Sequence, residues 1–436
     1  MHVAWTLFAR VLMTVNSVAA GIIVARWLGV EGLGQLAVIN VAVATIVQLG
    51  SAGLPSANTY FIAQDRRLLA PAAVNSLVFA LVAGGLLALG LTGLAAWRPD
   101  WFGFIPPRLI GIAAVSIPFQ LITLVGLNIF LAVGRVGRFN LLDLAGQSFV
   151  LLNAVVALVI LNAGLWSLVS LNTVASVLIG LLIALLVAAY GLGMKERTAW
   201  RPDLQLFGRM MRYGVKFHIS IVAAMLIFRV DLLLVNYIRG AGEAGVYSVA
   251  SQVAMMLMVL PGVIATLLFP RVASAPADRR GELTCVVTRH TAFIMLIICL
   301  LALPLSFALP LLYGAPFTDA TMQLWLLLPG VYLVSIESVL AQYFSASGLP
   351  VAIPLFWLAT LVVNVTLNIV LVPGFGARGA AIASTIAYAM IFALVVLYFR
   401  RATGHGISSA TLLSAAELRD LFDAKRFGVL SRSGRH

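Results

Sequence analysis

The residues most able to do chemistry are charged side chains inside long apolar stretches: Arg10, Asp143, Arg229, Asp231 and Glu337. A charge at the centre of a membrane-spanning helix costs about 2.5–3.5 kcal/mol on insertion scales, so each is expected to face a cavity or a partner. A guanidinium in a cavity binds phosphate oxygens. A buried carboxylate instead takes up a proton or a cation.

Arg229 is the strongest of these candidates because it lies too deep in its apolar stretch to reach either interface easily. It should line a cavity or pair with a carboxylate. Asp231 is only two residues further, roughly 200° around a helix, and so cannot be its side-by-side partner. Arg10 lies nearer a helix end, where it could either snorkel to the interface or line the cavity.

The carboxylates leave several readings open. Asp143 is expected to pair locally with Arg135 or Arg138, which lie one to two helical turns away. Glu337 has no partner visible in the sequence and is a candidate proton or cation site, as is Asp231.

A separate group of uncharged polar residues falls in the first two apolar stretches of each half: Asn16, Asn40, Gln48, Asn58, Asn236, Ser251 and Gln252. Interhelical hydrogen bonding would explain any one of them, but together they favour a hydrated cavity.

Catalytic and metal motifs do not occur in the sequence. It contains no Asp-x-Asp, His-Glu-x-x-His or Gly-x-Ser-x-Gly pattern, and its five histidines lack a ligand spacing. Cys285 and Cys299 do not suggest a disulfide framework. We expect no enzyme activity, no cofactor and no metal site.

The composition is that of a polytopic membrane protein, with 62% hydrophobic and 10% charged residues, against about 45–50% and about 25% in average proteins. Twelve apolar stretches satisfy the length of about 20 residues that a span needs. They lie near 3–28, 34–62, 72–97, 107–132, 138–161, 164–190, 212–238, 243–269, 288–312, 319–345, 350–372 and 376–400.

Corresponding motifs in the two halves predict an internal repeat. Gly164, Asn172 and Thr173 stand 212 positions before Gly376, Ser384 and Thr385. Gly-rich turns around 29–34 and 240–245 follow related helices, and helix breaks are expected at 50–55 and 261–262. Six spans per half give parallel repeats, hence an all-α fold of two six-helix bundles around a central cavity. The predicted domains are 1–190, a cytoplasmic connection 191–211, 212–400 and a basic tail 401–436.

The positive charges predict the orientation. One side of the predicted topology holds 21 Lys and Arg residues, and the other holds Arg26, Arg98, Arg108, Arg239 and Arg378. By the positive-inside rule both termini are cytoplasmic. This distribution also explains the net charge of +13 without nucleic acid. A capping-box pattern, Ser414 to Glu417, predicts either a short interfacial helix in the tail or a solvated segment.

The segment Arg10-Val-Leu through Ala25-Arg26-Trp-Leu-Gly29-Val-Glu31-Gly-Leu-Gly34, with its echo Gly240-Ala-Gly-Glu243-Ala-Gly245, resembles the polysaccharide-export flippases of the multidrug/oligosaccharidyl-lipid/polysaccharide (MOP) exporter superfamily. The resemblance implies alternating access of two lobes and transport of polyprenyl-pyrophosphate-linked oligosaccharides, such as O-antigen or exopolysaccharide units, across the bacterial inner membrane. It implies that Arg10, Arg26 and Arg229 meet the pyrophosphate, although Arg26 lies near the outer interface. Polysaccharide polymerase or export proteins are expected partners, besides membrane lipids.

The sequence is also compatible with two other functions. A proton- or sodium-coupled multidrug antiporter of the same superfamily would need an acidic coupling site, for which Asp231 and Glu337 are the candidates. A membrane glycosyltransferase or polysaccharide polymerase would need a sizeable outer loop, which the spacing of the predicted spans does not provide.

Overall fold

The computed structural model describes all residues except 1, 104, 194–199, 349 and 414–436, and the described residues form helices and turns without any strand. Within the described residues, ten helical segments are long and apolar enough to cross a membrane, and a bent pair of shorter helices makes eleven. The first of these segments, Phe8–Gly50, is broken at Gly29 and holds two predicted spans. Each of the twelve predicted spans therefore has a helical counterpart, and the all-α polytopic fold is confirmed.

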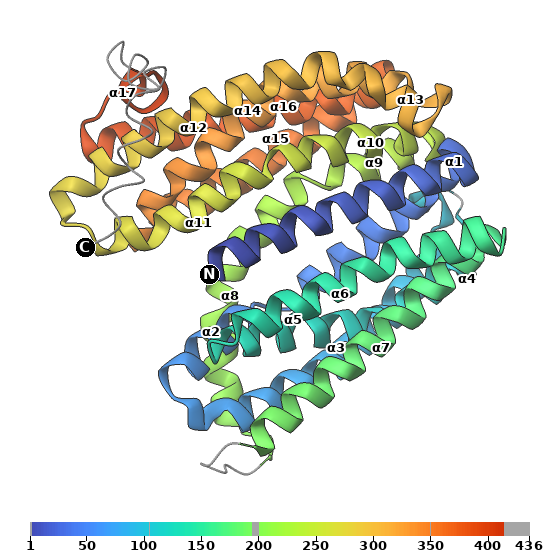
Figure 1. Ribbon diagram of the computed structural model, residues 1–436, viewed down its shortest axis with the longest axis horizontal. Coiled ribbons are helices and arrows are strands. Elements are labelled where there is room, and N and C mark those ends of the chain that lie inside the picture. Colours follow the sequence, from blue (N-terminus) through green and yellow to red (C-terminus); the bar gives the residue numbers. More distant parts are fainter. Residues whose placement is uncertain (1, 104, 194–199, 349, 414–436) are drawn as a thin grey trace. The chain divides into compact units, whose positions relative to one another are not determined.

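The helices follow one another along the chain as shown in Figure 1. The first predicted half contains α1 (His2–Gly50), α2 (Leu54–Gln64), η1 (Arg66–Leu68), α3 (Leu69–Trp97), η2 (Pro99–Phe102), α4 (Pro107–Ala114), α5 (Ile117–Ala132), α6 (Val136–Ala154), the π-helical turn η3 (Val155–Ile160) and α7 (Gly164–Leu192). The second contains α8 (Leu204–Ile227), α9 (Val230–Arg239), α10 (Ala241–Leu257), α11 (Val259–Ser274), α12 (Ala277–Leu305), η4 (Ser306–Ala308), α13 (Leu309–Tyr313), η5 (Ala315–Phe317), α14 (Asp319–Ala346), α15 (Ala352–Phe375), α16 (Ala377–Thr403) and α17 (Ile407–Thr411).

The helix breaks agree only partly with the sequence. The break expected at 50–55 is confirmed, because α1 ends at Gly50 and Gly53 adopts a left-handed conformation. The break expected at 261–262 is wrong in position: α10 ends at Leu257 and α11 begins at Val259. Pro261 falls in the first turn of α11, where a missing N–H breaks no intrahelical hydrogen bond.

The stretch between the two predicted halves is partly helical. α8 already begins at Leu204, inside the predicted 191–211 connection, because the Asp203 side chain caps the Leu206 N–H at 2.9 Å. The predicted tail helix after Ser414 lies outside the described residues.

Glycines with positive φ recur at the repeat spacing. Gly29 (φ 70°, ψ −170°) and Gly240 (φ 90°, ψ 174°) have nearly the same conformation and stand 211 positions apart. A positive φ also recurs at Gly103 and Gly314, which stand 211 positions apart, at Gly164 and Gly376, 212 apart, and at Gly134 and Gly348, 214 apart. Because such backbone favours glycine, the chain uses glycine at equivalent turns in both halves. This agreement supports the predicted repeat.

By contacts the chain divides into two compact units that are each made of several segments. The first comprises Met1–Val253, Ser306–Leu327 and Trp357–Ser384, and the second comprises Ala254–Leu305, Leu328–Phe356 and Thr385–His436. These units are groups of packed helices, and the domain boundaries at 190 and 212 stay a prediction. Every contact described below lies within one unit.

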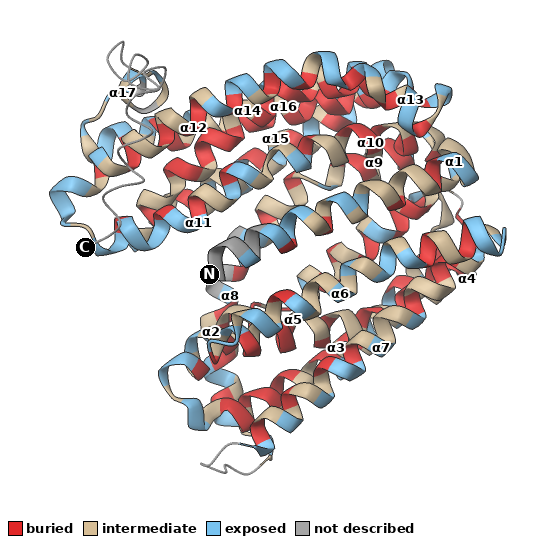
Figure 2. Cartoon of the chain, in the orientation of Figure 1, coloured by how far each residue is buried: buried red, intermediate tan, exposed pale blue. Residues whose placement is uncertain are grey.

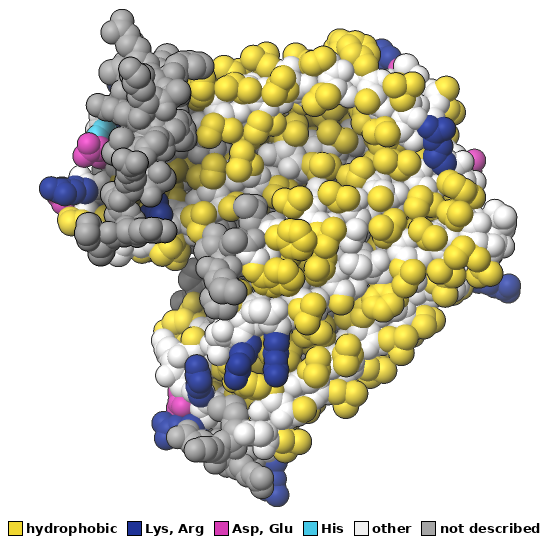
Figure 3. All heavy atoms as spheres, viewed as in Figure 1, with side chains coloured by type: hydrophobic (Ala, Val, Ile, Leu, Met, Phe, Trp, Pro, Cys, Tyr) yellow, Lys and Arg dark blue, Asp and Glu magenta, His cyan; other side chains and the backbone are white. Residues whose placement is uncertain are grey.

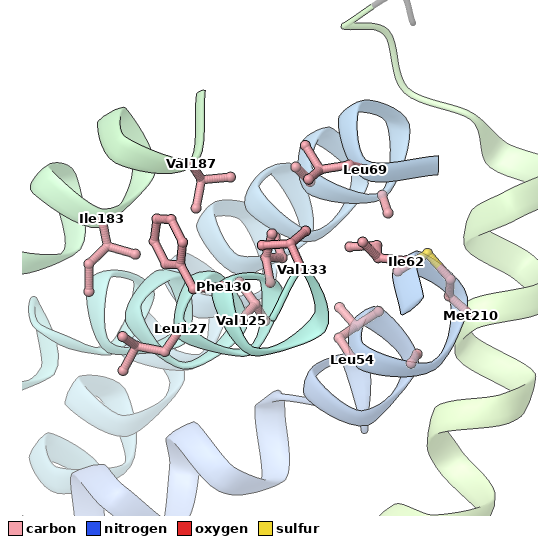
Figure 4. Close-up of a cluster of buried hydrophobic side chains, with 14 of the residues drawn as sticks. Leu54, Ile62, Leu69, Val125, Leu127, Phe130, Val133, Ile183, Val187 and Met210 are labelled. Carbon is pink, nitrogen blue, oxygen red and sulfur yellow. The ribbon is translucent and has the colours of Figure 1, made fainter. Parts of the chain in front are cut away.

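The first unit has an apolar core between α2, α3, α5, α7 and α8. Leu54, Ile62, Phe130 and Val187 are at most 1% exposed and point toward one another in Figure 4, with Met210 of α8 closing one side. The core thereby fixes α8, the helix that leads to Arg229, against the first predicted half.

The outer faces of the helices are apolar as well. On α3, one stripe of exposed side chains runs through Val78, Val82, Leu86 and Leu89, the last of which is 72% exposed. Figure 2 shows exposed and intermediate residues along the outer faces of the helices, and hydrophobic side chains cover most of the face seen in Figure 3. Exposed aliphatic stripes of this length suit a lipid solvent.

Candidate functional site

Arg229 lies at a break in the middle of a spanning segment. α8 ends at Ile227 and α9 begins at Val230, with a 41° bend between the two helices. Arg229 itself is non-helical (φ −133°, ψ −24°) and exposed. Among the described residues, its guanidinium makes no hydrogen bond or ion pair. The break therefore presents a cation whose donors are free for a ligand.

Asp231 lies two residues beyond Arg229 but is 2% exposed and faces a different environment. Its carboxylate accepts hydrogen bonds from the Tyr247 hydroxyl, from Ser384 Oγ at 3.0 Å and from the Leu232 backbone N–H at 2.7 Å. These donors come from α9, α10 and α16. The prediction that Asp231 does not pair with Arg229 is confirmed, since the carboxylate is held by three uncharged donors.

Arg10 and Asp143 form an ion pair between α1 and α6. Arg10 Nη1 lies 3.4 Å from Asp143 Oδ2, and their side chains are 45% and 21% exposed. The expectation that Asp143 pairs with Arg135 or Arg138 is wrong: α6 turns Asp143 toward α1, and Arg135 lies over the Tyr190 ring instead. Arg10 has room for a further partner because the contact is long and its side chain is half exposed.

Arg26 lies near the end of the first predicted span and contacts a short helix of the second half. Its Nε donates to the Leu312 carbonyl at 2.8 Å, and its Nη2 donates to the Leu311 carbonyl. Both carbonyls belong to the last turn of α13, whose C-terminal end favours a cation. Two of the three donor nitrogens of Arg26 are thus used within the protein.

Two of the polar candidates form interhelical contacts on α1. Asn16 Nδ2 donates to Ser148 Oγ of α6 at 3.0 Å, and Gln252 Nε2 of α10 donates to Ser17 Oγ at 2.9 Å. The structure therefore brings Arg10, Asn16 and Gln252 to nearby positions around one helix. No hydrogen bond or ion pair between described residues joins this group to Arg229.

The remaining polar candidates differ in burial. Asn40 is exposed and Gln48 is intermediate. Asn58 is fully buried and accepts from Ser76 Oγ at 3.0 Å. Asn236 is 1% exposed, and neither polar atom of its amide has a hydrogen-bond partner among the described residues. Asn236 lies against Gly103, where a Cβ would come within 2.7 Å of its Oδ1.

Glu337 lies within the second unit, on α14. It is 2% exposed, and its Oε1 has no partner among the described residues. A buried carboxylate of this kind is a candidate for taking up a proton or a cation.

One row of polar residues was not selected from the sequence. Thr360, Asn364 and Asn368 are all fully buried on α15. Asn368 Nδ2 donates to the Asn364 carbonyl at 2.9 Å, and each of the three side chains retains a polar atom without a partner in the described chain. Their i, i+4, i+8 spacing places them on one helical face and is the signal that could have identified them.

Comparisons with known proteins agree with this architecture. A curated relative, "Probable low-salt glycan biosynthesis flippase Agl15" of Haloferax volcanii, is 23% identical over 211 residues, which cover 46% of this chain and 44% of the relative. The match therefore spans less than half of that protein's length.

Solved transporter structures share the fold. An inward-facing multidrug resistance MATE family transporter of the MOP superfamily aligns with a TM-score of 0.76 at 16% identity, covering 90% of this chain and 94% of that chain. The lipid II flippase MurJ in an inward closed conformation aligns with a TM-score of 0.72 at 15% identity, covering 94% and 88%. A MOP superfamily transporter from Pyrococcus furiosus aligns at 0.60 with 16% identity, covering 92% and 94%.

A family model described as "Polysaccharide biosynthesis protein" matches residues 3–275 of the chain. That range includes the Gly-rich turns of both halves and every candidate residue except Glu337. The chain belongs to the polysaccharide biosynthesis protein family.

Proposed function

We propose that this protein is a flippase that moves polyprenyl-pyrophosphate-linked oligosaccharides across the bacterial inner membrane by alternating access. The family match over residues 3–275 carries the proposal. The flippase named among its relatives and the lipid II flippase among its structural neighbours support the same substrate class.

The charges in the first unit suit such a substrate. A pyrophosphate headgroup needs cationic donors within the protein, while its lipid tail stays in the bilayer. At a helix break, Arg229 offers a guanidinium that has no partner among the described residues. Arg10 offers a second guanidinium, whose one ion pair with a described residue is the long contact with Asp143. In this proposal both line the central cavity, together with Asn16, Asn40, Gln48, Asn58, Asn236 and Gln252, and Arg26 contributes its remaining donor nitrogen near the outer interface.

The membrane potential would assist export. Moving two negative charges outward across an inside-negative potential of 100 mV yields roughly 4–5 kcal/mol. The proposed cycle therefore does not require ATP, and Glu337 is the proposed site for any coupling to a proton or cation. Asp231 is a weaker candidate for coupling because its carboxylate already accepts three hydrogen bonds.

The experiment that tests the proposal is deletion of the gene followed by analysis of lipid-linked glycans. We expect the glycan units to accumulate on the inner leaflet while their synthesis continues. Export at the normal rate in the deletion strain would contradict the proposal. Joining or transfer of sugars by the purified protein would favour the glycosyltransferase or polymerase alternative, and loss of drug export alone would favour the antiporter.

A further inference from the structure

The Gly-rich turns of the two halves contact each other reciprocally within the first unit. A Cβ on Gly34 would overlap the Ala241 carbonyl oxygen and lie 2.9 Å from the Gly245 backbone N. A Cβ on Gly245 would overlap the Val30 carbonyl oxygen and lie 3.0 Å from the Gly34 backbone N. Because Gly34 and Gly245, like Val30 and Ala241, stand 211 positions apart, the two contacts are equivalent under the repeat.

Elements next to the two turns also contact the opposite half in a reciprocal way. α1 contacts α13, where Arg26 binds the Leu312 carbonyl, and α9 contacts η2, next to which Asn236 lies against Gly103. α13 and η2 follow the third span of their halves, again about 211 positions apart. The end of the first span of each half therefore packs against the other half, next to the Gly-rich turns.

The central glycine contact is held by close packing alone. Among the described residues, no hydrogen bond or ion pair connects the stretch 29–34 with the stretch 240–245. Glycines allow two helix backbones to approach closely in a membrane, and the attraction between them is then dispersion and weak Cα–H···O contacts. Such a contact can separate without leaving a charge or a buried hydrogen-bond donor unpaired.

We propose that the reciprocal contact of Gly34 with Ala241 and of Gly245 with Val30 is the gate that closes one end of the transporter and parts once in each transport cycle. The inference rests on the alternating access of the proposed function. In such a cycle the two repeats separate at one end at a time, so a contact between equivalent turns near the repeat axis must break when that end opens. The charge asymmetry predicts that this end is extracytoplasmic.

The gate predicts a specific effect of adding one methyl group. Gly34→Ala and Gly245→Ala should each hold the gate apart, because the new Cβ would meet backbone rather than a flexible side chain. Gly242→Ala is the matched control, since Gly242 lies in the same turn, has nothing within 4 Å of its Cβ position and does not need a positive φ.

The measurement is cysteine labelling of reconstituted protein with a maleimide, after replacement of the two buried cysteines, Cys285 and Cys299, by alanine. An Ala244→Cys substitution reports whether the gate is open, because Ala244 is fully buried between Gly242 and Gly245 in this turn. An Ala383→Cys substitution, at a fully buried position of α16, reports general unfolding of the protein. We expect Gly34→Ala and Gly245→Ala to raise labelling at position 244 at least severalfold, with position 383 unchanged and with no rise in Gly242→Ala.

Unchanged labelling at position 244 in either variant would overturn the gate. A parallel rise at positions 244 and 383 would also overturn it, because it would mean that the glycines only maintain packing. These results do not depend on the substrate. If the deletion strain exports glycan normally, the proposed function fails while the labelling still decides whether the contact opens.

Discussion

Glu243 Oε2 on α10 accepts a hydrogen bond from the backbone N–H of Ala377, the first residue of α16, at 3.0 Å. Its other carboxylate oxygen accepts from Arg239 Nε at 2.9 Å. A helix N-terminus favours a carboxylate through its free N–H groups and its dipole. One side chain thus joins the end of α9, the start of α10 and the N-terminus of α16. Glu31, in the Gly-rich turn of the first half, is exposed and makes no hydrogen bond to a described residue.

Glu243→Ala should therefore destabilise the protein. Loss of a capping side chain typically costs about 0.5–2 kcal/mol, and we expect a lower melting temperature of the purified protein in detergent. Glu31→Ala is the control and should leave the melting temperature unchanged. Equal effects of the two substitutions would contradict the role assigned to Glu243.

The Arg10–Asp143 ion pair should matter less for stability than Arg10 does for transport. At 3.4 Å and with both side chains partly exposed, the pair is expected to contribute at most about 1 kcal/mol. Asp143→Asn should retain most glycan export, Arg10→Ala should lose most of it, and the double variant should export no better than Arg10→Ala. Rescue by the double variant would show instead that Arg10 serves only to neutralise Asp143.

The sequence predicted the spans and the repeat because both depend on patterns along the chain: the length of apolar stretches and the recurrence of glycine at turns. It also predicted that Asp231 does not pair with Arg229, since helix geometry alone excludes that pair. It could not identify the Tyr247 and Ser384 hydroxyls as the partners of Asp231, because these residues come from α10 and α16 and meet α9 only in the folded chain.

The same limit explains the wrong partner for Asp143. Arg135 and Arg138 are close in sequence, but the rotation of α6 is set by its packing against α1 and α7. The sequence does not predict the helix break at Met258, because no glycine or proline lies there. It wrongly predicts a break at Pro261, because a proline in the first turn of a helix, here α11, does not interrupt that helix.

Asp231→Asn should lower the stability of the first unit. An asparagine offers one acceptor oxygen and an NH₂ group, which would face a donor now satisfied by the carboxylate, and an unsatisfied buried donor costs about 1–3 kcal/mol. Tyr247→Phe should be milder, because Ser384 and the Leu232 N–H still bind the carboxylate. Membrane abundance and melting temperature measure both effects. A larger loss in Tyr247→Phe than in Asp231→Asn would contradict the proposed network.

The predicted orientation can be tested with exposed positions on the two sides. Arg201 lies in the connection before α8, and Thr318 lies between η5 and α14; both are exposed. In intact cells, a membrane-impermeant maleimide should label Thr318→Cys and spare Arg201→Cys, with both labelled after permeabilisation. The reverse pattern would place both termini outside the cytoplasm.

Arg229 provides the sharpest test of the proposed site. Its guanidinium has no protein partner among the described residues, while Asp231 is bound by Tyr247 and Ser384, and Asp143 by Arg10. Removing Arg229 therefore leaves no buried carboxylate without its partner. Arg229→Ala should abolish glycan export at a normal level of protein in the membrane. Arg229→Lys should restore part of the export, since lysine keeps the charge but loses the planar fork that binds two phosphate oxygens.

The measurement for Arg229 is complementation of surface polysaccharide in the deletion strain, alongside the quantified membrane level of each variant. Arg212→Ala is the matched control, because it removes an exposed cation from the N-terminal half of α8, the helix that leads to Arg229. It should export normally. Normal export by Arg229→Ala at normal abundance would eliminate phosphate binding by this residue. A fall in abundance that is corrected by neutralising Asp231 or Glu337 would show instead that Arg229 is a structural partner of that carboxylate.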